Sequence, residues 1–439
     1  MGYMKTAFSL RRKLETLRKK YPRFVYQKYF YRVKRGDLKI TLYFKIEPDI
    51  VLKPRIIIKN IPEGRLEKMG KRALNNLVFH LGLMEIPSYW KATCSPEIAI
   101  QAGYLDKNQI AWWHELMIKG MGQYFYQNKI DWRDPNFLKI SVNPGIAAPA
   151  LETTDIELKD GYLIPIGGGK DSIVTLNLLK ERGERINCFL LNPSRATKRT
   201  VKIAGLKSPV KAERRIDTDL LALNAKGYLN GHTPFTAVLS FLSVFCAVLF
   251  DYKNIAFSNE KSANEGNVTY LGKSINHQWA KTSEFEKMFR TYCQKYLAKN
   301  VNYSSFLRKY TELQIARMFA KYPKYFPAFS SCNRGLKTGK KWCCNCPKCL
   351  FTYLVLYPFL AKKDLHQIFG QDLFENKALL PIMCSLLGQA CPPKLGERRR
   401  RTHKPFECVG TYKESCLAVK LSLKKARKSK KIPYLLTKL

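Results

Sequence analysis

Acidic residues are scarce in this sequence: 34 Asp and Glu stand against 77 Lys and Arg among 439 residues, for a formal net charge of +43. Such an excess favours polyanionic partners, such as nucleic acid, anionic lipid or phosphate-bearing small molecules. The excess is spread along the chain and is dense only at residues 398–401 and 424–431. Because a diffuse excess also fits a bias in composition, nucleic acid is an alternative partner and not the favoured one.

The chain also lacks a long uninterrupted hydrophobic run. The longest apolar stretch, residues 235–250, contains Thr236, Ser240 and Ser243, and it is short for a membrane span, so it predicts a buried helix. Charged residues from Arg11 onwards interrupt the N-terminal segment, which argues against a signal peptide. We therefore expect a cytoplasmic protein without a membrane span.

Nor does the chain have the cysteine density of a small disulfide scaffold. Its 13 cysteines cluster unevenly over 439 residues, which indicates metal binding in a reducing compartment. Hydrophobic residues make up 46% and aromatic residues 12% of the chain. This is a globular composition, with room for two or three domains.

Patterns along the chain divide it into four parts. Residues 1–155 mix strand and helix patterns, which predicts an N-terminal α+β domain. Residues 156–325 alternate strand and helix, which predicts an α/β domain with a parallel sheet covered by helices. Residues 326–420 hold a cysteine cluster and a helical segment, and the lysine-rich residues 421–439 predict a solvated basic tail. The expected strands are 24–32, 38–46, 55–59, 161–166, 186–191 and 254–258, and the expected helices include 171–182 and 235–250, with Pro87, Pro96 and Gly103 as interruptions.

A glycine-rich run stands where the strand at 161–166 meets the following helix. It reads Gly167-Gly168-Gly169-Lys170-Asp171-Ser172. Glycines let the backbone approach phosphate oxygens, and a helix N-terminus offers free N–H groups and the positive end of its dipole. Lys170 adds charge, Ser172 a hydroxyl donor, and Asp171 a carboxylate that suits Mg²⁺ or a helix cap. The run is not a Walker loop, which needs Gly-Lys-Ser/Thr after a longer loop.

Four cysteines form a C-x10-C-x2-C-x2-C pattern: Cys332, Cys343, Cys346 and Cys349. Four thiolates suit tetrahedral Zn²⁺, and the short spacing lets a tight knuckle aim two sulfurs at one metal. An iron–sulfur cluster is the alternative. Cys344 is a fifth candidate, which we expect to lie outside the set. Because the pattern falls outside the glycine-rich run, we predict a structural role for the metal.

Two carboxylates follow the strand expected at 254–258. Glu260 and Glu265 belong to a polar segment at the carboxyl end of that strand, where active-site loops of such sheets lie. Either carboxylate could bind Mg²⁺ or move a proton. A solvated loop is the alternative interpretation.

Two isolated cysteines lie in segments that mix aromatic and basic residues. Cys94 belongs to residues 89–97, and Cys408 belongs to residues 403–410. A pair of thiols can invert a carbon by acting on opposite faces, so these cysteines are candidate proton-transfer residues. Single cysteines are more often small buried hydrophobes, which is the alternative.

The glycine-rich run resembles the Ser-Gly-Gly-x-Asp-Ser loop of the ATP pyrophosphatase (PP-loop) superfamily. Gly167 departs from that pattern, because the usual first serine and its hydroxyl contact are missing. The resemblance implies a parallel-sheet, HUP-like domain in which Gly168, Gly169, Asp171 and Ser172 grip the β,γ-pyrophosphate of ATP. It also implies that a substrate oxygen attacks the α-phosphate to give an adenylate.

The glycine-rich run, the cysteine pattern, residues 89–97 and residues 403–410 together resemble the ATP-dependent UDP-N-acetylmuramoyl-L-alanyl-L-glutamate epimerases of bacterial peptidoglycan synthesis. This resemblance implies an isomerase that uses ATP, Mg²⁺ and a structural Zn²⁺. Its implied substrate is a UDP-linked muramoyl dipeptide, which the N-terminal domain would recognise. The implied products of the nucleotide are AMP and pyrophosphate.

An enzyme that modifies tRNA or a nucleobase is the alternative function. The 7-cyano-7-deazaguanine synthases and the tRNA thiolases belong to the same superfamily and also carry cysteine metal sites. A chain of net charge +43 would also bind RNA readily. Against this alternative, residues 1–155 contain no recognisable RNA-binding module.

Overall fold

The protein is described by a computed structural model that covers residues 2–143, 153–389, 403–429 and 431–439. The arginine run at 398–401 lies outside these residues. The chain divides into two compact units, each built from three separate segments. Unit 1 consists of Met1–Asp160, Val210–Ile255 and Thr269–Tyr303, and unit 2 consists of Gly161–Pro209, Ala256–Val268 and Ser304–Leu439.

Unit 1 contains a mixed sheet with the strand order β9-β4-β2-β1-β5-β6. β1 and β2 form an antiparallel hairpin, whereas β5 pairs in parallel with both β1 and β6. Alternate residues of β2 are buried, as expected for a strand with one face on a core. The predictions of strands at 24–32, 38–46 and 55–59 are confirmed. The strands are β1 (Arg23–Lys34), β2 (Asp37–Ile46), β3 (Ile50–Leu52), β4 (Arg55–Ile58), β5 (Glu97–Ile100), β6 (Lys139–Val142), β9 (Val210–Arg215) and the small pair β11 (Val268–Tyr270) and β12 (Lys273–Ile275).

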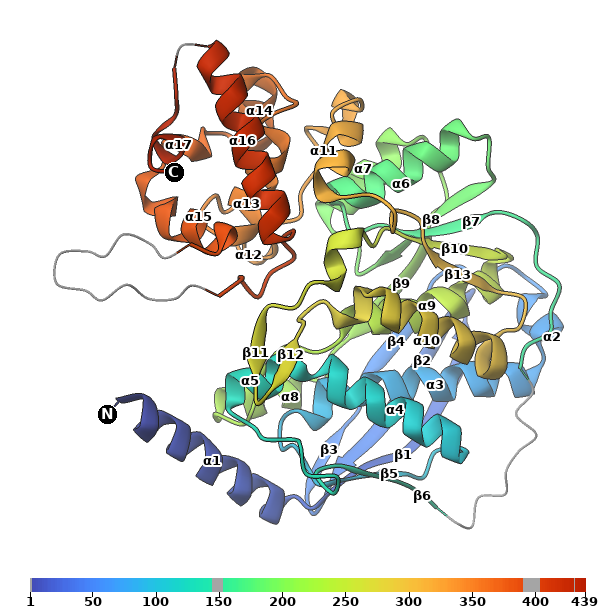
Figure 1. Ribbon diagram of the computed structural model, residues 1–439. Coiled ribbons are helices and arrows are strands. Elements are labelled where there is room, and N and C mark those ends of the chain that lie inside the picture. Colours follow the sequence, from blue (N-terminus) through green and yellow to red (C-terminus); the bar gives the residue numbers. More distant parts are fainter. Residues whose placement is uncertain (1, 144–152, 390–402, 430) are drawn as a thin grey trace. The chain divides into compact units, whose positions relative to one another are not determined.

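Two apolar helices of unit 1, α3 and α9, contact each other, and the short helix α2 contacts both (Figure 1). Pro87 was expected to interrupt helix formation, but it lies inside α3. An internal proline costs about 3 kcal/mol, and burial of nearly the whole second half of α3 outweighs that cost. The helices are α1 (Gly2–Lys20), α2 (Arg65–Met69), α3 (Lys71–Trp90), α4 (Lys107–Gly120), α5 (Gly122–Asn128), α8 (Thr218–Ala225), α9 (Phe235–Phe250), η2 (Trp279–Lys281), α10 (Ser283–Tyr292) and η3 (Cys293–Leu297).

Unit 2 begins with a strand–helix–strand repeat. β7 (Tyr162–Pro165) and β8 (Ile186–Leu191) pair in parallel, and α6 (Lys170–Glu181) connects them. The local strand order is β13-β10-β7-β8. The chain passes between the units within β10 (Asn254–Phe257) and β13 (Asn302–Ser305). The predicted parallel pairing and α/β arrangement are therefore confirmed for this repeat.

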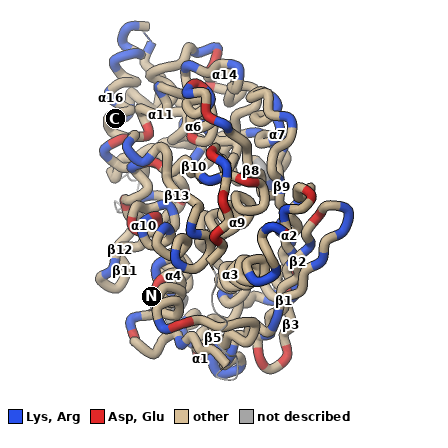
Figure 2. The backbone as a smooth tube through the Cα atoms, turned by 90° about the vertical axis from the view of Figure 1, so that its right-hand side faces the viewer, with Lys and Arg blue, Asp and Glu red and all other residues tan. Residues whose placement is uncertain are grey.

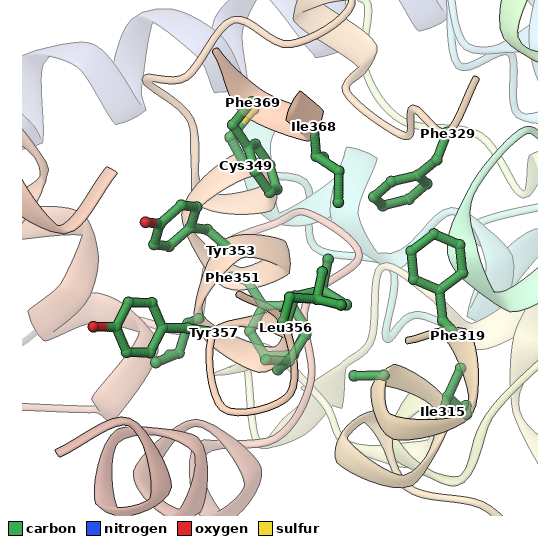
Figure 3. Close-up of a cluster of buried hydrophobic side chains, with 14 of the residues drawn as sticks. Ile315, Phe319, Phe329, Cys349, Phe351, Tyr353, Leu356, Tyr357, Ile368 and Phe369 are labelled. Carbon is green, nitrogen blue, oxygen red and sulfur yellow. The ribbon is translucent and has the colours of Figure 1, made fainter. Parts of the chain in front are cut away.

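Several of the remaining helices of unit 2 contribute buried side chains to its hydrophobic core (Figure 3). Ile315 and Phe319 of α11 belong to this core, together with Tyr353 of α13 and Phe369 of α14. Cys349 is also fully buried there, so the cysteine cluster forms part of the core. The elements are α7 (Arg195–Ile203), η1 (Lys261–Asn264), α11 (Glu312–Phe319), η4 (Pro323–Tyr325), α12 (Asn333–Lys337), α13 (Pro347–Leu356), α14 (Lys362–Phe369), η5 (Leu373–Glu375), η6 (Lys377–Leu379), α15 (Leu380–Leu387), α16 (Tyr412–Lys428) and α17 (Tyr434–Thr437).

The lysine-rich end of the chain, predicted as a solvated tail from residue 421, instead packs on unit 2. α16 buries Ala418, Ser422 and Ala426, which recur every four residues and so share one helix face. Leu435 in α17 is also fully buried. The lysines lie mainly on the opposite face of α16. The segment is therefore an amphipathic helix, which its basic composition did not predict.

Basic residues are distributed over most elements, and acidic residues interrupt them at few places (Figure 2). This agrees with the diffuse charge inferred from the sequence. Within the residues that the structure describes, no helix has both the length and the apolar character needed to cross a bilayer.

Candidate active site

The glycine-rich loop lies between β7 and α6, as predicted. Gly168 has a φ of +83°, which residues with a side chain rarely adopt. A Cβ atom on Gly168 would lie 3.1 Å from the Ala196 Cβ and 3.3 Å from the Ser330 carbonyl oxygen. Gly167, in contrast, is exposed and has open space around it. Only Gly168 of these two is therefore required to be glycine by the fold itself.

The N-terminus of α6 suits an anion. Its N-cap residue is Gly169, which makes no side-chain cap hydrogen bond. The Ser172 hydroxyl donates to the Gly169 carbonyl at 3.1 Å, which tightens the turn. The first backbone N–H groups of α6 and its dipole therefore remain available to phosphate oxygens.

Lys170 is buried and joins two carboxylates. Its ammonium group donates to Asp171 at 2.5 Å and also to Glu312, at the start of α11. Burial opposes the charge of Lys170, but the carboxylates of Asp171 and Glu312 outweigh burial and raise its pKa. The lysine is therefore fully protonated at neutral pH.

Glu312 lies at a crowded acidic position. Burial raises the pKa of Glu312 to about 8, and the carboxylates of Asp171 and Glu260 reinforce this effect against the opposing attraction of Lys170. The backbone N–H of Glu312 donates to the Glu414 carboxylate at 2.9 Å. One ammonium group thus faces several carboxylates, an excess of negative charge that a divalent cation would relieve.

The two carboxylates predicted after β10 differ in their surroundings. Glu260 is buried and contributes to the raised pKa of Glu312, so it belongs to the same acidic group. Glu265 instead accepts a hydrogen bond from the buried Lys404 at 3.1 Å and another from the Tyr412 backbone at 3.4 Å. The structure therefore brings Glu260 close to the loop machinery and ties Glu265 to the segment before α16.

The four predicted cysteines come together. The Sγ atoms of Cys332, Cys343, Cys346 and Cys349 all lie within 4.8 Å of one another, as a group that could hold a metal ion. The hydrogen bond between the Cys346 and Cys349 Sγ atoms is the largest influence that lowers the pKa of the Cys346 thiol. Cys344 points elsewhere, because its Sγ donates to the Phe369 carbonyl at 3.4 Å.

The cysteine group is connected to the glycine-rich loop. The Ser330 backbone N–H, two residues before Cys332, donates to the Gly168 carbonyl at 3.0 Å. A Cβ atom on Gly169 would lie 3.4 Å from the Ser331 Cβ. The segment that leads into the cysteine group therefore packs against the loop and supports it, which suits a structural role for the group.

The two isolated cysteines lie in different units. Cys94 of unit 1 is fully buried, and burial raises the pKa of its thiol to about 11. Arg18 donates to the Cys94 carbonyl at 2.7 Å and approaches its Sγ at 3.8 Å. Cys408 of unit 2 is half-buried. At neutral pH the buried Cys94 thiol is therefore protonated.

The sequence analysis missed Glu312, Lys404 and Glu414. Glu312 lies 142 residues from Lys170 in the chain, and no local pattern connects them. A signal did exist, because Thr311 and Gln314 form a capping box that starts α11 and fixes Glu312 in its first turn. Glu414 belongs to a similar capping box at the start of α16.

The fold and site define a mixed α/β protein with a glycine-rich strand-to-helix loop and a four-cysteine group that could hold a metal ion. The chain belongs to the MurL family: the family model of the MurL N-terminal domain matches residues 15–306, and that of the MurL C-terminal domain matches residues 328–436. Both the loop and the cysteine group fall within the matched ranges.

Three curated relatives share the name UDP-N-acetyl-alpha-D-muramoyl-L-alanyl-L-glutamate epimerase. The relative from Micromonospora sp. is 36% identical over 339 residues, which cover 76% of this chain and 72% of the relative. Those from Salinispora tropica and Xanthomonas oryzae pv. oryzae are each 35% identical over 76% of this chain, and cover 70% and 71% of the relatives. The chain is therefore similar to epimerases along most of its length.

Proposed function

We propose that this chain converts the terminal L-glutamate of UDP-N-acetylmuramoyl-L-alanyl-L-glutamate to D-glutamate, at the expense of ATP, in cytoplasmic synthesis of peptidoglycan precursors. The observation that carries this proposal is the similarity to three relatives that share one name over 76% of the chain. The alternative of a tRNA- or nucleobase-modifying enzyme has no comparable support.

The glycine-rich loop supports the use of ATP. Gly168 has a positive φ and is closely packed, so a side chain does not fit at this position. The backbone around Gly168 can therefore approach a phosphate group directly. The uncapped start of α6 and the Ser172 hydroxyl would hold the pyrophosphate part of ATP. The Asp171 and Glu260 carboxylates would share a Mg²⁺ ion bound to those phosphates.

Adenylation explains why an epimerase would consume ATP. A free carboxylate resists loss of the neighbouring α-proton, because the resulting carbanion would sit beside a full negative charge. When the carboxylate oxygen attacks the α-phosphate, pyrophosphate leaves and the substrate becomes a mixed anhydride with a more acidic α-proton. Water then cleaves the anhydride after inversion and releases AMP.

Two residues are needed to move the proton, one on each face of the α-carbon. The sequence predicts Cys94 and Cys408 for this role. Glu260 or Glu265 could replace one of them as base. Zn²⁺ on the four cysteines would stabilise the loop without entering the reaction.

Deuterated water provides the test. The wild-type enzyme should form AMP in step with D-glutamyl product, and this product should carry deuterium at the glutamate α-carbon. Cys94→Ser and Cys408→Ser should lose inversion but still form AMP, and Cys416→Ser, a half-buried thiol on α16, should behave as wild type. Inversion without deuterium, or without AMP, would overturn the mechanism.

A further inference from the structure

Unit 1 holds a second cluster of ionisable side chains, apart from the loop and the cysteines. The half-buried imidazoles of His232 and His277 lie with their ring centroids 5.1 Å apart and their planes inclined by 50°. Among the lysines, Lys91 and Lys281 have the charges that most affect the pKa of His232. These four residues, Lys91, His232, His277 and Lys281, form what we call the imidazole cluster.

Hydrogen bonds hold the turn that carries His232. The Lys91 ammonium donates to the Gly231 carbonyl at 3.1 Å, and the Asn128 amide donates to the Asn230 carbonyl at 3.0 Å. A Cβ atom on Gly231 would lie 3.0 Å from the Tyr124 ring. The turn therefore presses against α5 and has little freedom to move.

A second rigid turn carries His277. The Asn276 side chain accepts a hydrogen bond from the Gln278 N–H at 2.7 Å, and the Lys281 ammonium donates to the Gln278 side chain at 3.2 Å. Both imidazoles are thus placed by backbone that is already ordered. Sites built in this way bind a ligand with little loss of conformational entropy.

The charges of the imidazole cluster have one sign. Burial and then the charge of His277 lower the pKa of His232 to about 4, against a backbone hydrogen bond to His277 that raises it, and the charges of Lys91 and Lys281 lower it further. Helix α9 begins at Phe235, three residues after His232, with no acidic residue in its first turn and no side-chain cap. The positive end of its dipole adds to the same electrostatic field.

We propose that the imidazole cluster binds the diphosphate of the UDP-linked substrate. This inference rests on the proposed function, which supplies the substrate class. A diphosphate would offset the mutual repulsion of the cluster, with two ammonium groups as point charges and the His277 imidazole as a directional donor, while the backbone hydrogen bond from His232 to His277 holds the two turns together. The loop proposed for ATP belongs to unit 2, whereas the imidazole cluster belongs to unit 1.

Titration calorimetry with UDP and uridine on the full-length protein tests this assignment. His232→Gln, His277→Gln and Lys91→Met should each weaken UDP binding by roughly tenfold or more, as expected for loss of a charge-assisted contact. Uridine, which lacks the diphosphate, should bind more weakly than UDP and with the same affinity in wild type and variants. The exposed His366 of α14 supplies the control, and His366→Gln should alter neither affinity.

Imidazole NMR on the wild-type protein provides a second test that needs no variant to fold. Addition of UDP should raise the pKa of His232, because a nearby dianion favours the imidazolium form. Unchanged UDP binding in both histidine variants, or a His232 pKa that does not respond to UDP, overturns the inference. If the binding tests fail but the wild type still epimerises the muramoyl dipeptide, the proposed function stands and only this inference falls. If the cluster binds UDP but the wild type does not epimerise the dipeptide, only the proposed function is overturned.

Discussion

Gly167 and Gly168 are neighbours in one loop but differ in what the fold requires of them. Gly168→Ala places a side chain at a φ of +83° and within 3.1 Å of Ala196, which costs about 1–2 kcal/mol. We expect a lower unfolding midpoint and an ATP affinity reduced by roughly tenfold, the change that about 1.4 kcal/mol produces. Thermal unfolding and the KM for ATP in AMP formation measure both effects.

Gly167→Ala is the matched control, because a Cβ atom there meets nothing within 4 Å. It should retain wild-type stability and ATP affinity. Equal losses of stability and ATP affinity in the two variants would mean that the loop needs flexibility at both glycines. Such a result would contradict the prediction that only Gly168 must be glycine.

Glu312 should make the stability of the protein depend on pH. Its pKa is about 8 in the fold and 4.5 as the unperturbed value, so the folded protein holds a proton that the unfolded chain has released. The free energy of unfolding should therefore fall as the pH rises from about 4.5 to 8. Glu312→Gln removes this titration and should lose less stability over the same range.

Thermal unfolding midpoints of both proteins, measured without nucleotide across this pH range, test the prediction. The exposed Glu67 of α2 serves as control, since Glu67→Gln should follow the wild-type curve. Parallel curves for wild type and Glu312→Gln would show that Glu312 stays ionised beside Lys170.

Lys170 and Glu312 show what the sequence can predict about single residues. Lys170 and Asp171 could be predicted as site residues because they belong to a local pattern at a strand-to-helix turn. Glu312 comes from the start of another helix, and only packing of α11 against α6 brings it to Lys170. Residues that act together through the tertiary fold leave no joint pattern in the chain.

Among the secondary-structure elements, the knuckle of four cysteines supports the glycine-rich loop through the segment at Ser330 and Ser331. Cys346→Ser should therefore lose the metal, about one ion per chain for a closed four-thiolate site, and should also lower stability and ATP affinity. Elemental analysis and thermal unfolding measure the outcome. Iron with sulfide in the wild type would replace zinc as the assigned metal.

Cys344→Ser is the matched control for this prediction. Cys344 adjoins the knuckle in sequence, but its Sγ donates to the Phe369 carbonyl and is not one of the grouped sulfurs. The variant should keep the metal. Loss of metal from Cys344→Ser, with retention by Cys346→Ser, would mean that the ligand set is wrong.

Elements with dense apolar runs were predicted best. Residues 186–191 and 235–250 became β8 and α9 with the expected bounds, because the centre of β8 and most of α9 are buried and so leave a nearly continuous apolar signal. α16 was missed because alanine and serine line its buried face and lysines dominate its composition. α3 continued through Pro87 because tertiary packing outweighed a local preference.

At the scale of the whole molecule, the two units interleave along the chain. β4 pairs with β9, and α3 packs against α9, although β9 and α9 lie beyond residue 209. We therefore predict that a fragment of residues 1–160 does not fold alone, because it lacks the partners of β4 and α3. Circular dichroism and amide dispersion in NMR spectra would detect this. A cooperatively unfolding fragment would show that residues 1–160 form an autonomous domain.

Interleaving also has a consequence for synthesis of the protein. A ribosome adds about 5–20 residues per second, so β4 and α3 leave the exit tunnel several seconds before β9 and α9 exist. During that delay the nascent chain exposes an open strand edge and an apolar helix, both of which promote aggregation. We expect soluble yield to depend on chaperones that shield the first 160 residues, and slower translation between residues 160 and 250 to lower that yield.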